Sequence, residues 1–195
     1  MRESSVRAFQ RRGTSSKNQA RSGLWKHGPL FLFVCYPLTM IAQSTFSSPV
    51  GHINLTAYGE NIIEITMTKT PGPSHGSAKV IKEAQKQLTE YFKGKRKEFT
   101  FSFEARGTKF QQSVWSEIAR IPFGQVLSYA DIAREIGKPQ ASRAVGGAVG
   151  SNPVPIAIGC HRVLGASGRI TGYSGGEGLP TKRWLLALEG IETKD

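Results

Sequence analysis

A cysteine, a histidine and an arginine follow one another at the end of an apolar run. The run is NPVPIAIGCHRV at residues 152–163, and it contains Cys160, His161 and Arg162. A thiolate is a strong nucleophile, and nearby cationic or imidazole groups favour its formation. The pattern predicts a strand that ends on a reactive thiol. The alternative is a buried cysteine that packs as a small hydrophobic residue, and for an isolated cysteine this alternative is favoured.

A helix of very small residues precedes this run. QASRAVGGAVG at residues 140–150 has two glycines side by side, although each interior glycine costs a helix about 1 kcal/mol relative to alanine. Small side chains allow close approach, either to another helix or to a DNA duplex. Arg143 favours DNA, because a long cation among tiny residues can enter a groove; pairing with an acidic side chain is the alternative. The small residues that would face DNA are Ala141, Ser142, Gly146 and Gly147.

The elements that position these residues are mainly helical. Helical spacing of Phe110, Val114, Trp115 and Ile118 predicts a buried helix over 108–121, with Pro122 just beyond it. Ser128 is a predicted N-cap for a helix that ends at Gly137. With the helix at 140–150, this makes a helix-turn-helix pattern.

The preceding part of the chain predicts a small sheet with one helix. Two alternating segments within 47–68 flank the turn signal YGEN, which indicates a hairpin. Residues 78–95 place Val80, Ala84, Leu88 and Phe92 on one helical face. Residues 97–107 alternate as a strand should, and we expect them to complete the sheet.

The chain of 195 residues carries a formal net charge of +12, which favours a polyanionic partner. Half of the excess lies in residues 1–39, which contain seven Lys or Arg and one Glu. The only cysteines are Cys35 and Cys160, and no spacing suggests a zinc site or a disulfide framework. We expect a reducing, cytoplasmic setting, no metal and no membrane span.

Residues 1–45 are predicted to be an N-terminal extension. A basic segment precedes the apolar stretch 29–42, which has the length of a signal-peptide core but is interrupted by two prolines and is too short to span a bilayer. A transit peptide is another possibility. We favour Met40 as the natural start, with residues 1–39 either disordered or not translated.

Three segments together resemble a known family. SYADIAREIGKPQASRAVGGAVG, SGRITGYSGG and KRWLLALEG flank the Cys-His-Arg run in an order that resembles the O6-alkylguanine-DNA alkyltransferases, most closely the bacterial methylated-DNA-protein-cysteine methyltransferases. The resemblance covers residues 46–190 and is strongest after residue 110.

The resemblance implies a fold and a reaction. We expect an α/β (α+β) protein with a small ribonuclease H-like sheet domain at 46–106. A helical, winged-helix or helix-turn-helix domain at 107–192 would bind DNA and carry the alkyl acceptor. The implied reaction is stoichiometric removal of alkyl groups from O6 of guanine, and also from O4 of thymine, in double-stranded DNA. The implied protein is a monomer that needs no cofactor.

The family also implies a role for each site residue. Cys160 would be the alkyl acceptor, His161 a base acting through water, and Glu189 the group that orients the histidine. Tyr129 would help to rotate the nucleotide and donate a hydrogen bond to N3, while Asn152 would order the turn before the cysteine. Arg143 would be the finger that fills the gap in the duplex, and Arg162 a structural brace. The pocket would be formed by the Val163 backbone, Tyr173, Ser174 and Lys182.

One residue departs from the family pattern. The family motif is Pro-Cys-His-Arg, whereas this chain has Gly159 before Cys160. Glycine restores a backbone N–H and allows a wider range of φ than proline, so the Cys160 thiol could be held in a different position from the one in the family. An alkyltransferase-like protein that binds lesions without repairing them is therefore the alternative function, although such proteins lack the cysteine.

Two further classes of protein fit parts of the sequence. A transcription-factor module would explain the helix-turn-helix and the positive charge, but it leaves the Cys, His and Glu positions unexplained. A cysteine hydrolase would need an oxyanion loop, and no such loop is recognisable in the sequence.

Overall fold

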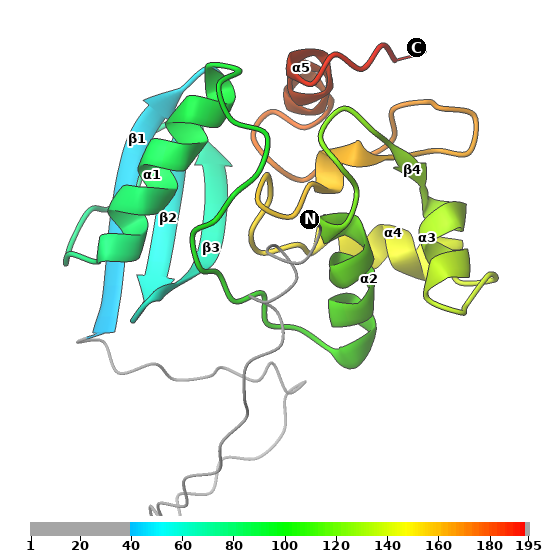
Figure 1. Ribbon diagram of the computed structural model, residues 1–195, viewed down its shortest axis with the longest axis horizontal. Helices are drawn as coiled ribbons and strands as arrows, with labels where there is room; N and C mark the ends of the chain where they lie inside the picture. The colour runs from blue at the N-terminus through cyan, green and yellow to red at the C-terminus, as the bar shows by residue number, and fades with distance from the viewer. Residues whose placement is uncertain (1–39, 194–195) are drawn as a thin grey trace, which may run out of the picture.

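The structure, a computed structural model, describes residues 40–193 and has a sheet part and a helical part (Figure 1). The sheet is antiparallel, in the order β1 (Ile41–Ser48), β2 (Gly51–Tyr58) and β3 (Asn61–Thr68). The predicted hairpin is confirmed as β2 and β3. Its turn contains Gly59 at φ +58°, a conformation that glycine adopts without steric cost.

The sheet begins earlier than the sequence predicted. Residues 41–45, predicted as part of the extension, belong to β1, which pairs with β2 from Ile41 onward. Gln43 also exchanges two backbone hydrogen bonds with His75, at 2.8 and 3.0 Å, so β1 is bonded on both edges. The predicted boundary at residue 45 is therefore wrong. Residues 1–39, the rest of the predicted extension, lie outside the described residues.

Helix α1 (Lys79–Phe92) packs against the sheet, as Figure 1 shows. The four residues predicted to share its apolar face, Val80, Ala84, Leu88 and Phe92, are all buried. Tyr91 is buried beside them, and its hydroxyl faces away from the sheet domain toward the helical part.

The predicted strand over 97–107 is not a strand. Its contact with the sheet is one isolated bridge from Phe103 to Ile62. The physical reason is a competing side chain: buried Gln87 of α1 accepts from the Thr100 backbone N–H at 2.8 Å and donates to its hydroxyl at 2.7 Å. At Thr100 this segment therefore forms hydrogen bonds with a side chain of α1, and not with the backbone of a neighbouring strand.

The helical part contains three short helices before the cysteine. They are α2 (Lys109–Ala119), α3 (Tyr129–Glu135) and α4 (Ser142–Gly150). Trp115 of α2 is buried, and its Nε1 donates to the Ala148 carbonyl of α4 at 2.7 Å. The prediction of a buried α2 face is confirmed for Val114, Trp115 and Ile118, whereas Phe110, the fourth residue of that face, is half-buried against the core.

The caps of α3 explain the helix-turn-helix. Ser128 caps its N-terminus, and the Asp131 side chain bonds back to the Ser128 backbone, which completes a capping box. At the other end Gly137 has φ +69°, and the Lys138 N–H donates to the Ala133 carbonyl at 2.8 Å. This C-terminal motif ends α3 and turns the chain into α4.

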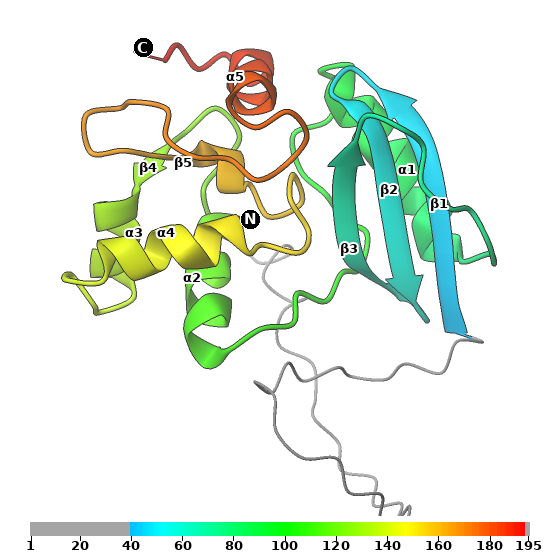
Figure 2. The same cartoon turned by 180° about the vertical axis from the view of Figure 1, so that it is seen from behind.

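Cys160 does not end a strand, contrary to the sequence prediction. Residues 152–159 form a folded turn, and Cys160–Arg162 are the 3-10 helix η3. Two prolines without N–H groups deprive this run of ladder donors. Only the two residues after η3 form a strand, β5 (Val163–Leu164), which pairs in parallel with β4 (Leu127–Ser128); the two lie side by side in Figure 2.

The last helix, α5 (Leu179–Leu188), lies over the junction of the two parts in both views (Figures 1 and 2). Its Trp184 ring lies 6.0 Å from the Phe92 ring of α1. The C-cap of α5 is Glu189, which is buried. A residue from the end of the chain is thereby brought between the sheet domain and η3.

Candidate active site

Asn152 organises the turn that leads to Cys160. Its side-chain amide donates to the Ile158 carbonyl at 2.9 Å, and its side-chain oxygen accepts from the Val154 N–H at 3.0 Å. Pro153 anchors the same turn to the sheet, because its carbonyl accepts from the Ile65 N–H of β3 at 2.9 Å. Ile156 has φ +73°, which is rare for a β-branched residue and stores backbone strain here.

The Cys160 thiol is buried within this structure. Burial raises its pKa, while the Asn152 side chain, the positive charge of Lys182 and the Tyr173 hydroxyl favour the thiolate. The Tyr173 hydroxyl is close enough to act on the thiol but makes no hydrogen bond of normal geometry to the described residues. The thiol therefore needs a base and a cation to ionise.

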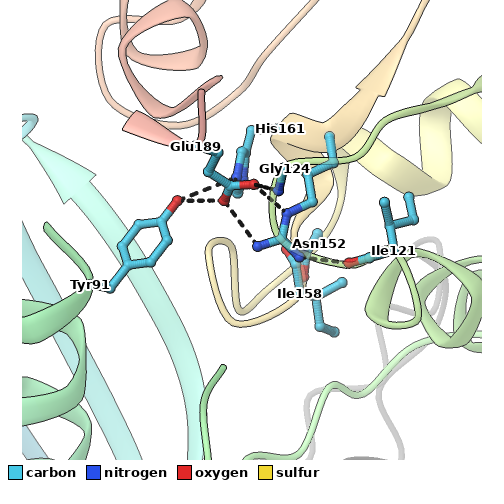
Figure 3. A network of polar contacts seen from close by, with 8 residues as sticks. Tyr91, Ile121, Gly124, Asn152, Ile158, His161 and Glu189 are labelled. Carbon is cyan, nitrogen blue, oxygen red and sulfur yellow. Dashed lines mark hydrogen bonds and ion pairs between the residues drawn. The ribbon is translucent and has the colours of Figure 1, made fainter. Parts of the chain in front are cut away.

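His161, the residue after Cys160, forms a buried pair with Glu189 (Figure 3). Nε2 of His161 lies 2.8 Å from Oε1 of Glu189. An ionised carboxylate only accepts hydrogen bonds, so Nε2 carries the proton and Nδ1 carries the lone pair. Nδ1 is buried and has no hydrogen-bond partner among the described residues. His161 thus presents a free basic nitrogen.

Arg162 and the loop before β4 complete the surroundings of Glu189. The guanidinium donates to both carboxylate oxygens at 2.9 Å and to the Ile121 carbonyl at 2.7 Å. The Gly124 N–H donates to Oε2 at 3.1 Å. Arg162 therefore braces Glu189, which agrees with the role expected for it.

The hydrogen bonds and the burial of His161 and Glu189 determine the charge that each side chain carries. Burial by itself would raise the pKa of Glu189, but hydrogen bonds from His161 and Arg162 hold the pKa of this carboxyl far below its usual range. Burial lowers the pKa of His161, and the opposing effect of Glu189 does not overcome it. The site therefore holds an ionised Glu189 beside a neutral His161, which can accept a proton.

Lys182 brings a buried amine to the same site. Its Nζ donates to the Val163 carbonyl at 2.6 Å and to the Thr171 carbonyl at 2.9 Å. Burial lowers its pKa to about 8, although the neighbouring Cys160 acts in the opposite sense. At neutral pH the amine is largely protonated, so it supports a thiolate electrostatically and ties β5 to the following loop.

A pocket of about 240 Å³ lies between α4 and the loop that carries Tyr173. Tyr129 and residues of α4 form one side, and the loop at 172–174 forms the other. The loop is fastened by two contacts: Ser174 Oγ to the Gly150 carbonyl at 2.9 Å, and Thr171 Oγ1 to the Tyr129 hydroxyl at 3.3 Å. The lining residues are Tyr129, Gly146, Val149, Gly150, Gly172, Tyr173 and Ser174. Tyr173 lines this pocket, and its hydroxyl also favours the thiolate form of the buried Cys160.

The small-residue helix α4 forms the exposed rim. Arg143 and Gly147 are exposed, whereas Ala141, Ser142 and Gly146 are half-buried. Arg143 makes no ion pair with any residue of the described range 40–193, so the alternative of a paired arginine finds no support there. A Cβ at Gly146 would lie 3.8 Å from the Tyr129 ring, an ordinary packing distance, so this part of α4 runs close beside Tyr129.

Gly159 lies directly under the Arg162 side chain. Its φ of −70° is one that proline also adopts. A Cβ at this position would lie 3.0 Å from three atoms of the Arg162 side chain, which is a tight contact. The φ angle at Gly159 thus suits the proline of the family motif, although the Arg162 side chain would have to shift slightly to make room for it.

The structure adds residues that the sequence analysis missed. The Tyr91 hydroxyl donates to Oε1 of Glu189 at 2.7 Å, and the Gly124 N–H donates to Oε2. A buried tyrosine on an apolar helix face needs a hydrogen-bond partner, and this signal could have drawn attention to Tyr91. No comparable signal marks Gly124.

Residues 40–193 contain neither a membrane-spanning helix nor a cluster of metal ligands. No helix in this range is long and apolar enough to cross a membrane. No group of three or more His, Cys, Asp or Glu side chains in the same range could hold a metal ion.

Comparison with known families matches both parts of the chain. Residues 41–105 match the family model described as "6-O-methylguanine DNA methyltransferase, ribonuclease-like domain". Residues 109–191 match "6-O-methylguanine DNA methyltransferase, DNA binding domain". The division falls where the sheet part ends and α2 begins.

Curated relatives and solved structures agree with this match. The methylated-DNA-protein-cysteine methyltransferase of Mycobacterium tuberculosis (strain H37Rv) is 43% identical over 155 residues, which is 77% of this chain and 93% of the relative. The constitutive enzyme of Bacillus subtilis is 37% identical over 161 residues, 78% of this chain and 97% of the relative.

The crystal structure of the M. tuberculosis O6-methylguanine methyltransferase superposes with a TM-score of 0.70 at 40% identity, over 80% of this chain and 97% of that one. The M. tuberculosis protein solved in complex with DNA superposes with a TM-score of 0.68 at 44% identity, over 74% of this chain and 90% of that one.

Proposed function

The chain belongs to the 6-O-methylguanine DNA methyltransferase family, and we propose that it repairs DNA by moving the alkyl group of O6-alkylguanine onto Cys160. The observations that carry the assignment of residues are the buried pair of Glu189 with His161, which directly follows the buried Cys160 in the chain, and a pocket lined by Tyr129, residues of α4 and Tyr173. O4-alkylthymine is a second substrate in this proposal.

The lesion must leave the base stack before it can react, because a buried thiol cannot approach the alkyl carbon in line with the bond to O6 while the base is stacked in an intact duplex. We infer that α4 lies against the DNA, with Arg143 entering the duplex as the nucleotide turns out. The exposed position of Arg143 and the bare surface around Gly147 support this placement. The extruded base then enters the pocket between Tyr129 and the loop at 172–174.

Cys160 must lose its proton before it attacks. We infer that a water molecule carries the thiol proton to Nδ1 of His161, whose tautomer is fixed by Glu189. The protonated amine of Lys182 stabilises the thiolate that forms. This division of labour into nucleophile, base and orienting carboxylate is common in enzymes with activated thiols.

The transfer itself is a displacement at the alkyl carbon. The sulfur of Cys160 forms a bond to this carbon, the bond from carbon to O6 breaks, and its electron pair passes into the guanine. Tyr129 donates a hydrogen bond to N3 as this charge develops. The proton that His161 took from the thiol returns through water to the guanine anion, so that neutral guanine is restored in the DNA and His161 is neutral again. The thioether is stable, so each chain reacts once and needs no cofactor.

All of these groups come from one chain, and we infer that a monomer is sufficient. The thiol must stay reduced to react, so a reducing, cytoplasmic setting suits the protein. The alternative, a lesion-binding protein without transfer activity, has no observation in its favour, because Cys160 is present together with its base.

Protein mass is the direct test. The purified protein is incubated with a duplex carrying one O6-methylguanine, in parallel with a Cys160→Ala variant. One added methyl group on Cys160, never more than one per chain and absent from the variant, supports the proposal. Lesion binding without any gain in mass would overturn it in favour of the non-catalytic alternative.

A further inference from the structure

Tyr91 reaches the active site from the other domain. It lies on α1, within the residues that match the ribonuclease-like domain, whereas Glu189 lies within the DNA-binding domain. The hydroxyl of Tyr91 donates to Oε1 of Glu189 at 2.7 Å and lies 3.4 Å from Nε2 of His161. Figure 3 shows the ring pointing at the carboxylate from the side of α1.

Aromatic packing fixes the position of this hydroxyl. The Tyr91 ring lies 5.4 Å from the Phe99 ring and 5.6 Å from the Phe92 ring, both from the sheet domain. It lies 6.2 Å from the Phe123 ring, in the loop whose next residue, Gly124, also donates to Glu189. A ring held on three sides cannot turn its hydroxyl away from the carboxylate.

Packing alone does not explain why a tyrosine stands here. Phenylalanine would fill the same space, and a buried hydroxyl is costly unless it is hydrogen bonded. The partner it finds is the oxygen that also accepts from His161 and from Arg162. Three donors therefore converge on Oε1, and one of them is the proposed base.

We propose that Tyr91 is a positioning residue for alkyl transfer: its hydroxyl holds Oε1 of Glu189 and takes up part of the carboxylate charge, so that His161 stays a neutral base and the sheet domain completes the active site. The inference rests on the proposed function and deepens it. It gives the sheet domain a part in the reaction, in addition to its structural one.

The hydroxyl also limits how strongly Glu189 attracts a proton to His161. The charged and titratable groups around this carboxylate are Tyr91 from α1 and His161 and Arg162 from η3, while Lys182 of α5 acts on His161 from the thiol side. Burial raises the pKa of Tyr91 above its usual range, so the hydroxyl remains a neutral donor. Without it, more of the carboxylate charge acts on His161, and the imidazolium is favoured.

The test compares full-length Tyr91→Phe with wild type in single-turnover methyl transfer from an O6-methylguanine duplex between pH 5 and 9. Protonated His161 cannot accept the thiol proton, so the rate falls on the acid side. One hydrogen bond to a charged group corresponds to about one pKa unit, so we expect the acid limb of the variant to lie about one pH unit higher. On that limb the variant should be about tenfold slower, and near pH 8.5 the two rates should converge.

The control is Tyr58→Phe, which removes a hydroxyl from β2 of the same domain and should leave the acid limb unchanged. A uniform loss of rate at all pH values in Tyr91→Phe, or no change at all, would overturn the proposal and leave Tyr91 a packing residue. Absence of transfer in the wild type as well would instead contradict the proposed function.

A second variant covers the case in which Tyr91→Phe does not fold. Replacing Tyr91 with 3-fluorotyrosine keeps the ring and makes the hydroxyl a stronger donor. The acid limb should then move in the opposite direction, to lower pH. Movement to higher pH, or an unchanged limb, would overturn the proposal.

Discussion

The guanidinium of Arg162 holds both oxygens of the Glu189 carboxylate, each at 2.9 Å, at a point where almost no solvent reaches either group. Paired donors of this kind suit the planar guanidinium and fix the orientation of the carboxylate. The carboxylate in turn fixes His161. Arg162 therefore acts on the chemistry only through two other side chains.

Glu189→Gln should destabilise the fold strongly. Removing one partner of a buried ion pair leaves an uncompensated charge and costs about 3–5 kcal/mol. The matched control is Glu117→Gln, which breaks the surface pair with Arg120 on α2 and should cost less than about 1 kcal/mol. Urea unfolding at pH 7 measures both free energies; equal losses would mean that the buried pair is not formed.

Lys182→Met should make the Cys160 thiol less reactive. The variant keeps the length of the side chain but removes the cation that favours the thiolate. A loss of one pKa unit of thiolate stabilisation corresponds to about a tenfold slower reaction at neutral pH. The rate of labelling by iodoacetamide, measured against pH, checks this.

The control for this experiment is Arg183→Met, which removes a charge of the same sign from the exposed neighbouring position on α5. Its labelling rate should stay close to that of the wild type. If both variants slowed equally, the effect would come from overall charge and not from the position of Lys182.

The chain's own departure from the family motif can be tested by restoring the proline. Both Gly159→Ala and Gly159→Pro place a Cβ 3.0 Å from the Arg162 side chain, so both carry the same crowding. Proline also restricts the unfolded chain, and the local φ of −70° suits it. We therefore expect Gly159→Pro to be about 0.4–1 kcal/mol more stable than Gly159→Ala. Thermal unfolding compares the free energies of unfolding of the two variants. A proline variant that is less stable than the alanine variant would contradict the prediction.

The periodicity of the sequence was sufficient for the regular elements. The faces of α1 and α2 were predicted correctly, because apolar spacing reports which side of a helix is buried. The run before Cys160 was predicted wrongly as a strand, because a short apolar segment looks the same in a buried strand and in a buried turn. What decides between them is the Asn152 side chain, which replaces backbone partners in the turn.

Only the identity of the site residues that belong to the family motifs could be predicted from the sequence. Cys160, His161 and Glu189 could be named from the family resemblance, but the distances and charges of the cluster could not. Tyr91 lies 98 residues before Glu189, and the meeting of the two depends on how α1 docks against α5 and η3. Helical spacing predicts that Tyr91 is buried, but it does not predict what its hydroxyl contacts.

Arg143→Ala should slow the repair of duplex DNA without slowing the chemistry. If Arg143 fills the gap left by the extruded nucleotide, its loss adds to an extrusion cost of a few kcal/mol, and we expect at least about a tenfold slower repair. Reaction with free O6-alkylguanine base, which needs no extrusion, should be unchanged. The control is Arg134→Ala, which removes an exposed cation that is already paired with Asp131 on α3. Equal slowing with duplex and free base would contradict the role as a finger.

Acid should destabilise the folded protein in two steps whose signs follow from the buried pair. The folded pKa of His161 lies below its unfolded value, so below about pH 6.5 the unfolded chain binds a proton that the folded chain does not, and stability falls. The folded pKa of Glu189 is also lowered, so its contribution is present above about pH 4.3 and is lost as the pH falls further. Urea unfolding from pH 8 to pH 3 should show both losses. In His161→Gln the first should disappear while the second remains; a His161→Gln variant that still loses stability between pH 6.5 and 5 would show that another group titrates there.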